Sequence, residues 1–278
     1  MEIQKIIDSL KEVQVISGPF EGGQKSVYKC IINQKYNALK FIKSSEIGDE
    51  CNLRCKRELS TLAMCKSDYL IKLGELPYTE IIEENEYIIY YSEEWIEGYN
   101  LYELIKNGKK FTEADIRKLG IELSYAIEEL WKHNKIHRDI KPLNIMYDSV
   151  KDRYVLLDLG MVFDSTNDAL TKYGYLPGTM GYYSPEQFDL ARKNDLDFRS
   201  DLFCVGIVLY QLLCGKHPFM IAGDTPQEVF EKIKNVNPAR LENVSPNLEN
   251  IVFRLLRKRP SERFRSCSML RDFLMKGE

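Results

Sequence analysis

The sequence predicts an α+β fold in two parts, a smaller part rich in strands with one helix and a larger part that is mostly helical. Runs rich in β-branched and aromatic residues, which are typical of strands, occupy residues 11–17, 26–33, 36–43 and 86–96. One helical pattern, at 48–66, interrupts these runs. From Asn100 onward the apolar residues recur at the helical spacing of three and four positions.

The two parts are not separated by a repeat, a low-complexity tract or a Gly/Ser linker, so we expect one catalytic unit of two lobes. The change of period falls in the segment EWIEGYN. We therefore expect a docked N-terminal helix at 1–12, a first lobe at 13–96 and a second lobe at 97–278. A crevice between a sheet lobe and a helical lobe is a common ligand site.

Two helix starts are recognisable in the second part. Asn100 and Glu103 have the spacing of a capping box, in which each residue bonds the backbone amide of the other. Thr112 and Asp115 form a weaker version of the same motif, and an apolar helical pattern follows it.

The composition excludes some classes of partner. The 278 residues are 44% apolar and carry a net charge of −3, which gives no general attraction to nucleic acid or to membranes. The segment MEIQKIIDSLKEV has its isoleucines on one helical face, which favours a docked helix over a signal peptide. The longest apolar run, LFCVGIVLYQLLCG, is shorter than a membrane span, so we expect a soluble cytoplasmic protein.

The cysteines indicate reduced thiols. There are seven, an odd number, and none forms a C-x-x-C pair. Cys51, Cys55 and Cys65 lie close in the sequence, but no nearby histidine or fourth ligand completes a tetrahedral metal set. We expect these cysteines to pack in the core.

The segment HRDIKPLN, residues 137–144, places charged and polar side chains between apolar neighbours. A helical pattern precedes it, and the short apolar runs IMY and YVLLD, which predict a hairpin, follow it. A loop held between ordered elements in this way can position catalytic residues rigidly. Asp158 ends the second run, where a buried carboxylate would need a cation, a metal ion or several hydrogen-bond donors.

Two further residues are ambiguous when considered alone. Lys40, in the strand pattern NALKFIK, could be an edge-strand lysine that reaches solvent. Glu58 lies four residues before Leu62 on a helical face and could be an ordinary surface glutamate.

Together these motifs resemble the signature of the protein kinase family. HRDIKPLN is followed by VLLDLG, the two aspartates are 158 − 139 = 19 residues apart, and a strand lysine and a helix glutamate lie upstream. The resemblance runs from about Val13 to the C-terminus. The segment GTMGYYSPEQ is similar to the end of the activation segment in bacterial, Hanks-type Ser/Thr kinases. The resemblance implies the two-lobed protein-kinase fold, with a small antiparallel sheet and one helix in the first lobe.

The resemblance also implies catalytic roles. Asp139 would orient the substrate hydroxyl and accept its proton, and Lys141 would contact the γ-phosphate. Lys40 would contact the α- and β-phosphates of ATP and pair with Glu58. Mg²⁺, or Mn²⁺, would be held by two residues, Asn144 and Asp158.

The implied ATP site draws mainly on the first lobe. Its residues would be Gly22, Gly23, Lys25, Val27, Ala38, Lys40, Glu94, Ile96 and Met146. Glu93 falls at the family's gatekeeper position, and the sequence leaves open whether its side chain points into the pocket.

The glycine-rich loop matches the family only in part. Phe20, Gly22 and Lys25 stand at the positions of its three glycines. Since a Cβ hinders close approach of the backbone to phosphates, we expect either weak nucleotide binding or a compensating charge from Lys25.

The remaining residues that the resemblance implies are structural or regulatory. His137, Leu62 and Leu159 would pack together, Glu186 and Arg263 would form a buried ion pair, Asp201 would brace the catalytic loop unless it is an ordinary helix cap, and Arg138 would receive a phosphorylated activation loop. Thr166 and Thr171 are candidate phosphorylation sites, and Thr179 would help to place the substrate.

The function implied is an ATP-dependent Ser/Thr protein kinase, for which Lys141, two residues after Asp139, favours Ser/Thr acceptors over tyrosine. Its partners would be ATP and a protein substrate, with a transient dimer for autophosphorylation. One alternative is a pseudokinase that acts as a binding or scaffold module, which the altered glycine loop favours. Another is a small-molecule kinase of the aminoglycoside or choline type, which lacks a segment like GTMGYYSPE.

Overall fold

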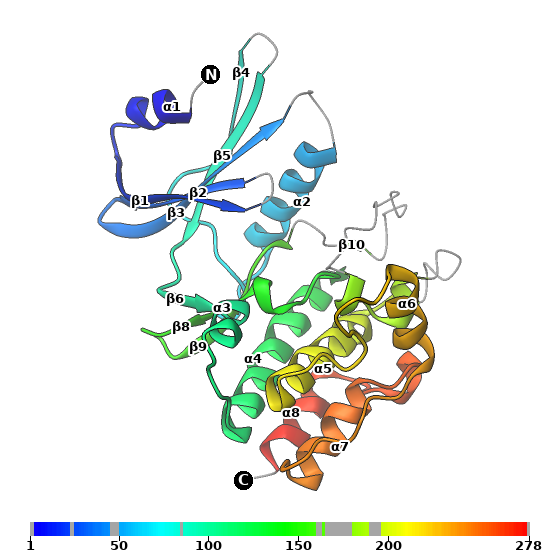
Figure 1. Cartoon of the computed structure of the whole chain (residues 1–278). Coiled ribbons are helices and arrows are strands. Elements are labelled where there is room, and N and C mark those ends of the chain that lie inside the picture. The colour runs from blue at the N-terminus through cyan, green and yellow to red at the C-terminus, as the bar shows by residue number, and fades with distance from the viewer. Residues whose placement is uncertain are drawn as a thin grey trace. The chain divides into compact units, whose positions relative to one another are not determined.

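The computed structural model describes residues 3–22, 25–44, 50–83, 86–159, 163–164, 180–188 and 196–276. The described residues form two compact units. The first unit is built from residues within 1–64, 71–97 and 158–160, and the second from residues within 65–70, 98–157 and 161–278. Figure 1 shows a sheet with helices in the first unit and a mainly helical second unit, which confirms the predicted α+β fold class.

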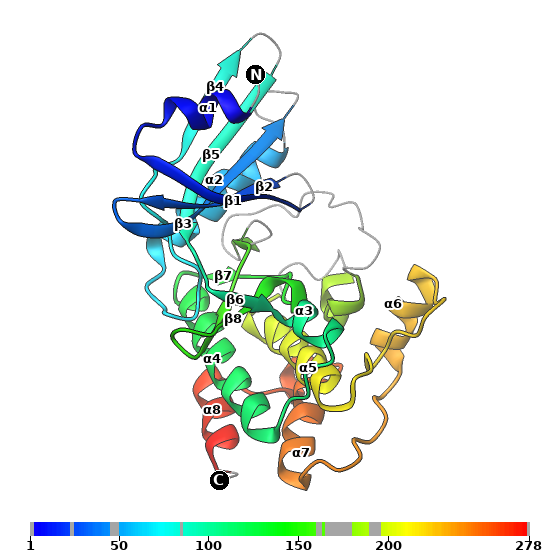
Figure 2. The same cartoon turned by 60° about the vertical axis from the view of Figure 1, so that its left-hand side comes forward.

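The first unit is a five-stranded antiparallel sheet with the strand order β1-β2-β3-β5-β4 (Figure 2). Its strands are β1 (Val13–Gly22), β2 (Lys25–Ile32), β3 (Lys35–Ser44), β4 (Thr79–Glu83) and β5 (Glu86–Glu94). The predicted strand runs correspond to β1, β2, β3 and β5, whereas β4 was not predicted.

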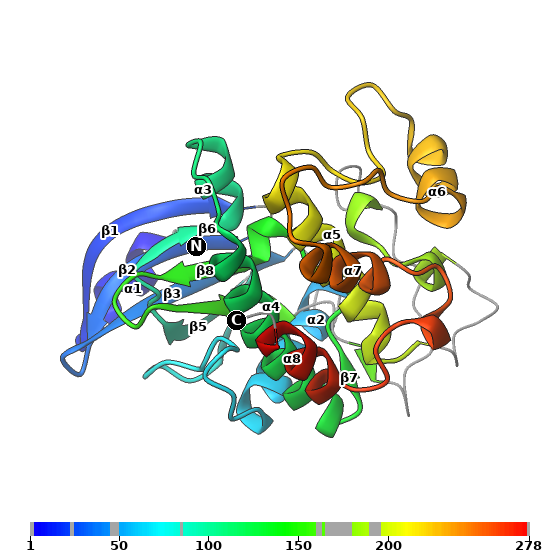
Figure 3. The ribbon, with the colours of Figure 1, turned by 90° about the horizontal axis from the view of Figure 1, so that it is seen from below.

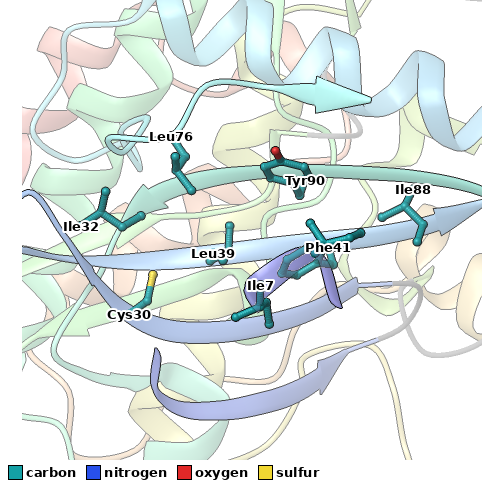
Figure 4. Packing of buried hydrophobic residues seen from close by; sticks show 9 residues of the cluster. Ile7, Cys30, Ile32, Leu39, Phe41, Leu76, Ile88 and Tyr90 are labelled. Atoms are coloured by element: carbon teal, nitrogen blue, oxygen red, sulfur yellow. The ribbon is translucent and has the colours of Figure 1, made fainter. Parts of the chain in front are cut away.

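A helix covers each face of this sheet. Helix α1 (Ile3–Ser9) places Ile6 and Ile7 against one face, in a cluster with residues of β2, β3 and β5 such as Leu39 and Phe41 (Figure 4). Helix α2 (Glu50–Met64) contributes Cys55 and other residues to a cluster on the opposite face. Because side chains alternate along a strand, consecutive residues of β3 enter the two clusters in turn.

The second unit is assembled from helices and two small sheets (Figure 3). Its helices are α3 (Leu101–Lys106), α4 (Glu113–Lys132), α5 (Phe198–Cys214), α6 (Pro226–Asn235), α7 (Pro246–Leu255) and α8 (Cys267–Met275). Its strands are β6 (Gly98–Asn100), β7 (Lys135–Ile136), β8 (Ile145–Asp148), β9 (Arg153–Leu156) and β10 (Phe163–Asp164). Strands β6, β8 and β9 form one sheet and β7 pairs with β10, and the pairing of β8 with β9 confirms the predicted hairpin.

Local sequence explains how the central helices of this unit begin and end. Both predicted capping boxes are present, at Asn100 for α3 and at Thr112 for α4. Helix α5 is buried on nearly all sides and packs against α4 and α7, as its almost continuous apolar sequence requires. Its C-cap, Gly215, has a φ of 72°, a left-handed conformation that glycine adopts without strain. Within the described part of the chain, no helix combines the length and the apolar character that a membrane crossing needs.

We expect His217 to make the stability of the folded chain sensitive to acid. Its Nδ1 accepts a hydrogen bond of 3.1 Å from the backbone N–H of Phe219, and its ring stands edge-on to Tyr182. Burial lowers the pKa of His217 to about 4, against the opposing effect of the Gly181 backbone. The unfolded chain binds a proton at His217 near pH 6.5, whereas the folded chain binds it only near pH 4. The contribution of His217 to the free energy of unfolding is therefore complete above pH 6.5 and is lost as the pH falls from 6.5 to 4.

We expect this loss to reach at most about 3 kcal/mol of unfolding free energy. Urea unfolding measured from pH 7.5 to pH 4 tests it, with His217→Phe as the variant that cannot titrate. A slope with pH that is the same in the parent and in His217→Phe would contradict the assignment.

Candidate active site

The segment 137–144 connects β7 to β8, and Asp201 fixes its backbone. The two carboxylate oxygens of Asp201 accept hydrogen bonds from the backbone N–H groups of His137, at 2.8 Å, and Arg138, at 2.9 Å. Asp197, not Asp201, is the N-cap of α5. Asp201 therefore acts as a brace of the loop and not as a helix cap. Burial raises the pKa of its carboxyl group, and the neighbouring His137 and Arg138, with their two backbone donors, oppose that rise.

The loop presents the carboxylate of Asp139 between two donors. Lys141 Nζ lies 3.0 Å from Oδ1 and 2.8 Å from Oδ2 of Asp139. Asn144 Nδ2 donates to the backbone oxygen of Asp139 at 2.8 Å and to its Oδ2 at 2.9 Å. The side chain of Asp139 is thus held in one orientation by a cation and an amide.

His137 fixes the same loop through hydrogen bonds of its two ring nitrogens. The backbone N–H of Asp139 donates to His137 Nδ1 at 3.2 Å, which assigns the ring proton to Nε2. Nε2 then donates to the backbone oxygen of Leu157 at 3.0 Å, and the backbone N–H of Leu157 donates to the backbone oxygen of Asn144 at 2.8 Å. The imidazole is fully buried and has a positioning role in the loop.

In the first unit, Lys25 and Lys40 lie on the same face of the sheet. Val27 is opposite Lys40 in the register of β2 and β3, and Lys25 is two residues before Val27 on the same strand. The Nζ atom of Lys25 lies 3.0 Å from Glu58 Oε2 and 3.3 Å from Asp158 Oδ1. The Nζ atom of Lys40 lies 2.6 Å from Glu93 Oε2.

These contacts correct the expected pair between Lys40 and Glu58. Glu93 is opposite Ala38 in the register of β3 and β5, so its side chain shares a face with the nearby Lys40. The side chain of Glu93 is only 2% exposed, and a carboxylate buried to that degree requires a cation. Lys40 supplies that cation, and Lys25 takes the place beside Glu58.

The pKa shifts in this group follow from burial and from charge. Burial opposes the positive charge of Lys25, but Glu58, Asp158 and Glu93 outweigh this effect and hold the pKa of Lys25 well above its usual value. Burial raises the pKa of Glu93, although Lys40 opposes the rise. Lys25 is therefore a firmly charged group beside several carboxylates.

The other expected site residues have the following positions. Val27 is on β2, Ala38 is buried on β3, Glu94 ends β5, Ile96 is buried just after it, Met146 is on β8, Gly22 ends β1, and Leu62 and Leu159 are buried. Gly23, Thr166, Thr171 and Thr179 lie outside the described residues.

Glu186 and Arg263 form an ion pair in the second unit. Arg263 Nη1 and Nη2 lie 2.6 Å and 2.9 Å from the two carboxylate oxygens of Glu186. The Arg263 side chain is fully buried, and it also donates to the backbone oxygens of Arg257, Arg199 and Lys258. Burial opposes ionisation of Glu186, but Arg263 and the Ser200 hydroxyl hold its pKa below the usual value.

The family model described as a protein kinase domain matches residues 20–274. The chain belongs to the protein kinase family. This match includes the Asp139 loop, Asp158, both lysines and the Glu186–Arg263 pair.

Two curated relatives of this chain are bacterial proteins. The chain is 29% identical over 257 residues to the serine/threonine-protein kinase pkn3 of Myxococcus xanthus, which covers 87% of this chain and 46% of the relative. It is 28% identical over 230 residues to the serine/threonine-protein kinase PknB of Mycolicibacterium smegmatis, which covers 81% of this chain and 36% of the relative. The kinase domain thus spans less than half the length of these relatives, and the predicted resemblance to bacterial Ser/Thr kinases is confirmed.

The partners of Lys25 and Glu93 were not predicted from the sequence. A signal for Glu93 was available, because in β5 it follows Ile89 and Tyr91 at alternate positions on one strand face, where a buried acid needs a partner. No comparable signal in the sequence identifies Glu58 as the partner of Lys25, since this contact depends on where α2 packs.

Proposed function

We propose that the chain is an ATP-dependent Ser/Thr protein kinase, which transfers the γ-phosphate of Mg-ATP to a hydroxyl group of a protein. The observation that carries the proposal is the carboxylate of Asp139, held by Lys141 and Asn144 in a loop that Asp201 braces. The names of the relatives support the same activity.

The reaction assigns a distinct task to each group of the loop. The acceptor oxygen forms a bond to the γ-phosphorus while the bond between that phosphorus and the bridging oxygen of the β-phosphate breaks, and ADP leaves. The hydroxyl proton passes to Asp139, which is a fixed acceptor because its orientation is set by two donors. Lys141 stabilises negative charge on the transferred phosphoryl group.

The residues expected to hold a metal ion fit a hard cation. Asn144 uses its amide nitrogen for Asp139, which leaves its amide oxygen available to a metal ion, and Asp158 offers a carboxylate with 41% of its side chain exposed. Mg²⁺ prefers oxygen ligands of these kinds, and when bound it neutralises charge on the phosphates.

The adenine ring is assigned to Val27, Ala38 and Met146, with backbone hydrogen bonds from Glu94 and Ile96. The N–H of Glu94 already donates to the backbone oxygen of Lys72 at 2.9 Å. We therefore expect the backbone carbonyl group of Glu94 to accept a hydrogen bond from adenine and the backbone N–H of Ile96 to donate one to it.

The proposal includes autophosphorylation at Thr166 or Thr171, with Arg138 as the residue that binds the phosphate. Two copies of the chain would meet transiently for this reaction. Protein substrates would be placed with the help of Thr179.

Purified protein incubated with Mg-ATP labelled at the γ-phosphate tests the proposal, with casein added as a general acceptor. We expect label on the chain and on casein, on serine or threonine only, and no label when EDTA removes the metal. Mass spectrometry should find phosphate between residues 160 and 178. Nucleotide that binds without transfer of label would instead support the pseudokinase alternative.

A further inference from the structure

We propose that Lys25, and not Lys40, is the lysine that contacts the nucleotide phosphates, and that Lys40 is the permanent counter-ion of Glu93. The inference rests on the proposed ATP-dependent function and names a binding residue for it. It reassigns the role that the family resemblance gives to the lysine of β3.

Lys40 is held in its ion pair with Glu93 because both side chains are largely buried. The Nζ–Oε2 distance is 2.6 Å, and the two side chains are 12% and 2% exposed. Among the described residues, the other oxygen of Glu93, Oε1, has no hydrogen-bond partner. If Lys40 turned away toward a phosphate, the buried carboxylate of Glu93 would lose its ion-pair partner, which is a strongly unfavourable change.

Lys25 has both the pairing and the access that a phosphate contact needs. It binds Glu58 of α2 at 3.0 Å, which is the contact expected for the phosphate-binding lysine. Its side chain is 26% exposed, and its second partner, Asp158, is 41% exposed. Because an ammonium group has three donor hydrogens, Lys25 can keep Glu58 and Asp158 and still donate to a phosphate oxygen.

The position of Lys25 in the sheet also explains the altered glycine loop. Lys25 begins β2 and is opposite Gly22, the last residue of β1, so it stands at the end of the β1–β2 pair where this family has its glycine-rich loop. A side chain at this position hinders approach of the backbone amides. The charge of Lys25 replaces the lost amide contacts and makes the substitution of glycine a functional one.

Four variants of the full chain test the inference. Lys25→Met removes the proposed contact, and Lys25→Gly restores the family's glycine. Lys40→Met combined with Glu93→Met removes both members of the buried pair, a change that proteins commonly tolerate better than loss of one member. Lys29→Met is the matched control, because Lys29 is on the same strand and is also ion-paired, to Glu97 at 2.7 Å.

The readouts are the dissociation constants of Mg-ATP and of adenosine, measured by calorimetry, and kcat/KM for phosphate transfer. We expect Lys25→Met and Lys25→Gly to lower kcat/KM by about 10²- to 10³-fold and to weaken binding of Mg-ATP but not of adenosine. We expect the Lys40→Met/Glu93→Met double variant to stay within about tenfold of the parent and Lys29→Met within about fivefold. Urea unfolding of each variant separates loss of fold from loss of function.

The inference is overturned if Lys25→Met keeps the parent's affinity for Mg-ATP, if Lys25→Gly binds it more tightly, or if the folded double variant loses as much as Lys25→Met. The Lys25→Met result decides alone if the double variant does not fold. If the parent protein binds Mg-ATP but does not transfer phosphate, the proposed function is refuted. The dissociation constants of the variants still test whether Lys25 contacts the phosphates. A parent that does not bind Mg-ATP refutes both.

Discussion

Replacement of Asp139 by asparagine is expected to lower the rate of phosphate transfer by about 10²- to 10⁴-fold, the contribution typical of a positioned general base. The carboxylate is 6% exposed and receives bonds from Lys141 and from Asn144. Asparagine has nearly the same shape, but its amide cannot accept the hydroxyl proton, and its –NH₂ group cannot bond to the ammonium of Lys141. The defect should therefore appear in kcat.

Single-turnover transfer of labelled phosphate measures this effect. The affinity for Mg-ATP should change little, because the substitution acts on the acceptor hydroxyl. Asp152→Asn is a suitable control, since Asp152 is an exposed aspartate of the same unit that pairs with Lys118 and Tyr147. Transfer by Asp139→Asn at more than about a tenth of the parent's rate would exclude Asp139 as the base.

The loop around Asp139 was predictable because its contacts are mostly local. Lys141 and Asn144 follow Asp139 by two and five residues, and the helix before the loop and the hairpin after it have clear periodicity. The capping boxes at Asn100 and Thr112 were predictable for the same reason. Local patterns determine contacts between residues that are near in sequence.

The partners of the two lysines were not predictable in this way. Lys25 meets Glu58 across 33 residues of sequence, and Lys40 meets Glu93 through the register of β3 and β5. Both lysines face the same side of the sheet, so alternation alone cannot choose between them. Strand β4 was missed because its run, TEIIE, is short and carries a glutamate at its end.

The same distinction applies to Arg263, whose partner was expected from the family and not from the residues around it. Arg263→Ala is expected to lower the free energy of unfolding by about 3–5 kcal/mol. Arg263 is fully buried, donates to both carboxylate oxygens of Glu186, and also bonds three backbone carbonyl groups. Among the described residues, alanine would leave the buried Glu186 carboxylate with the Ser200 hydroxyl, at 2.7 Å, as its side-chain donor.

Urea unfolding at pH 7.5 measures this loss, and two other variants identify its cause. Arg271→Ala removes an arginine that pairs with Glu128, whose side chain is 32% exposed, so water can solvate the carboxylate left behind and the loss should be smaller. Arg263→Met with Glu186→Gln removes the buried charge together with its partner and should recover part of the stability lost in Arg263→Ala. If the double variant is no more stable than Arg263→Ala, the loss comes from packing and from the three carbonyl groups. If it recovers stability, the unpaired charge of Glu186 is the principal cost.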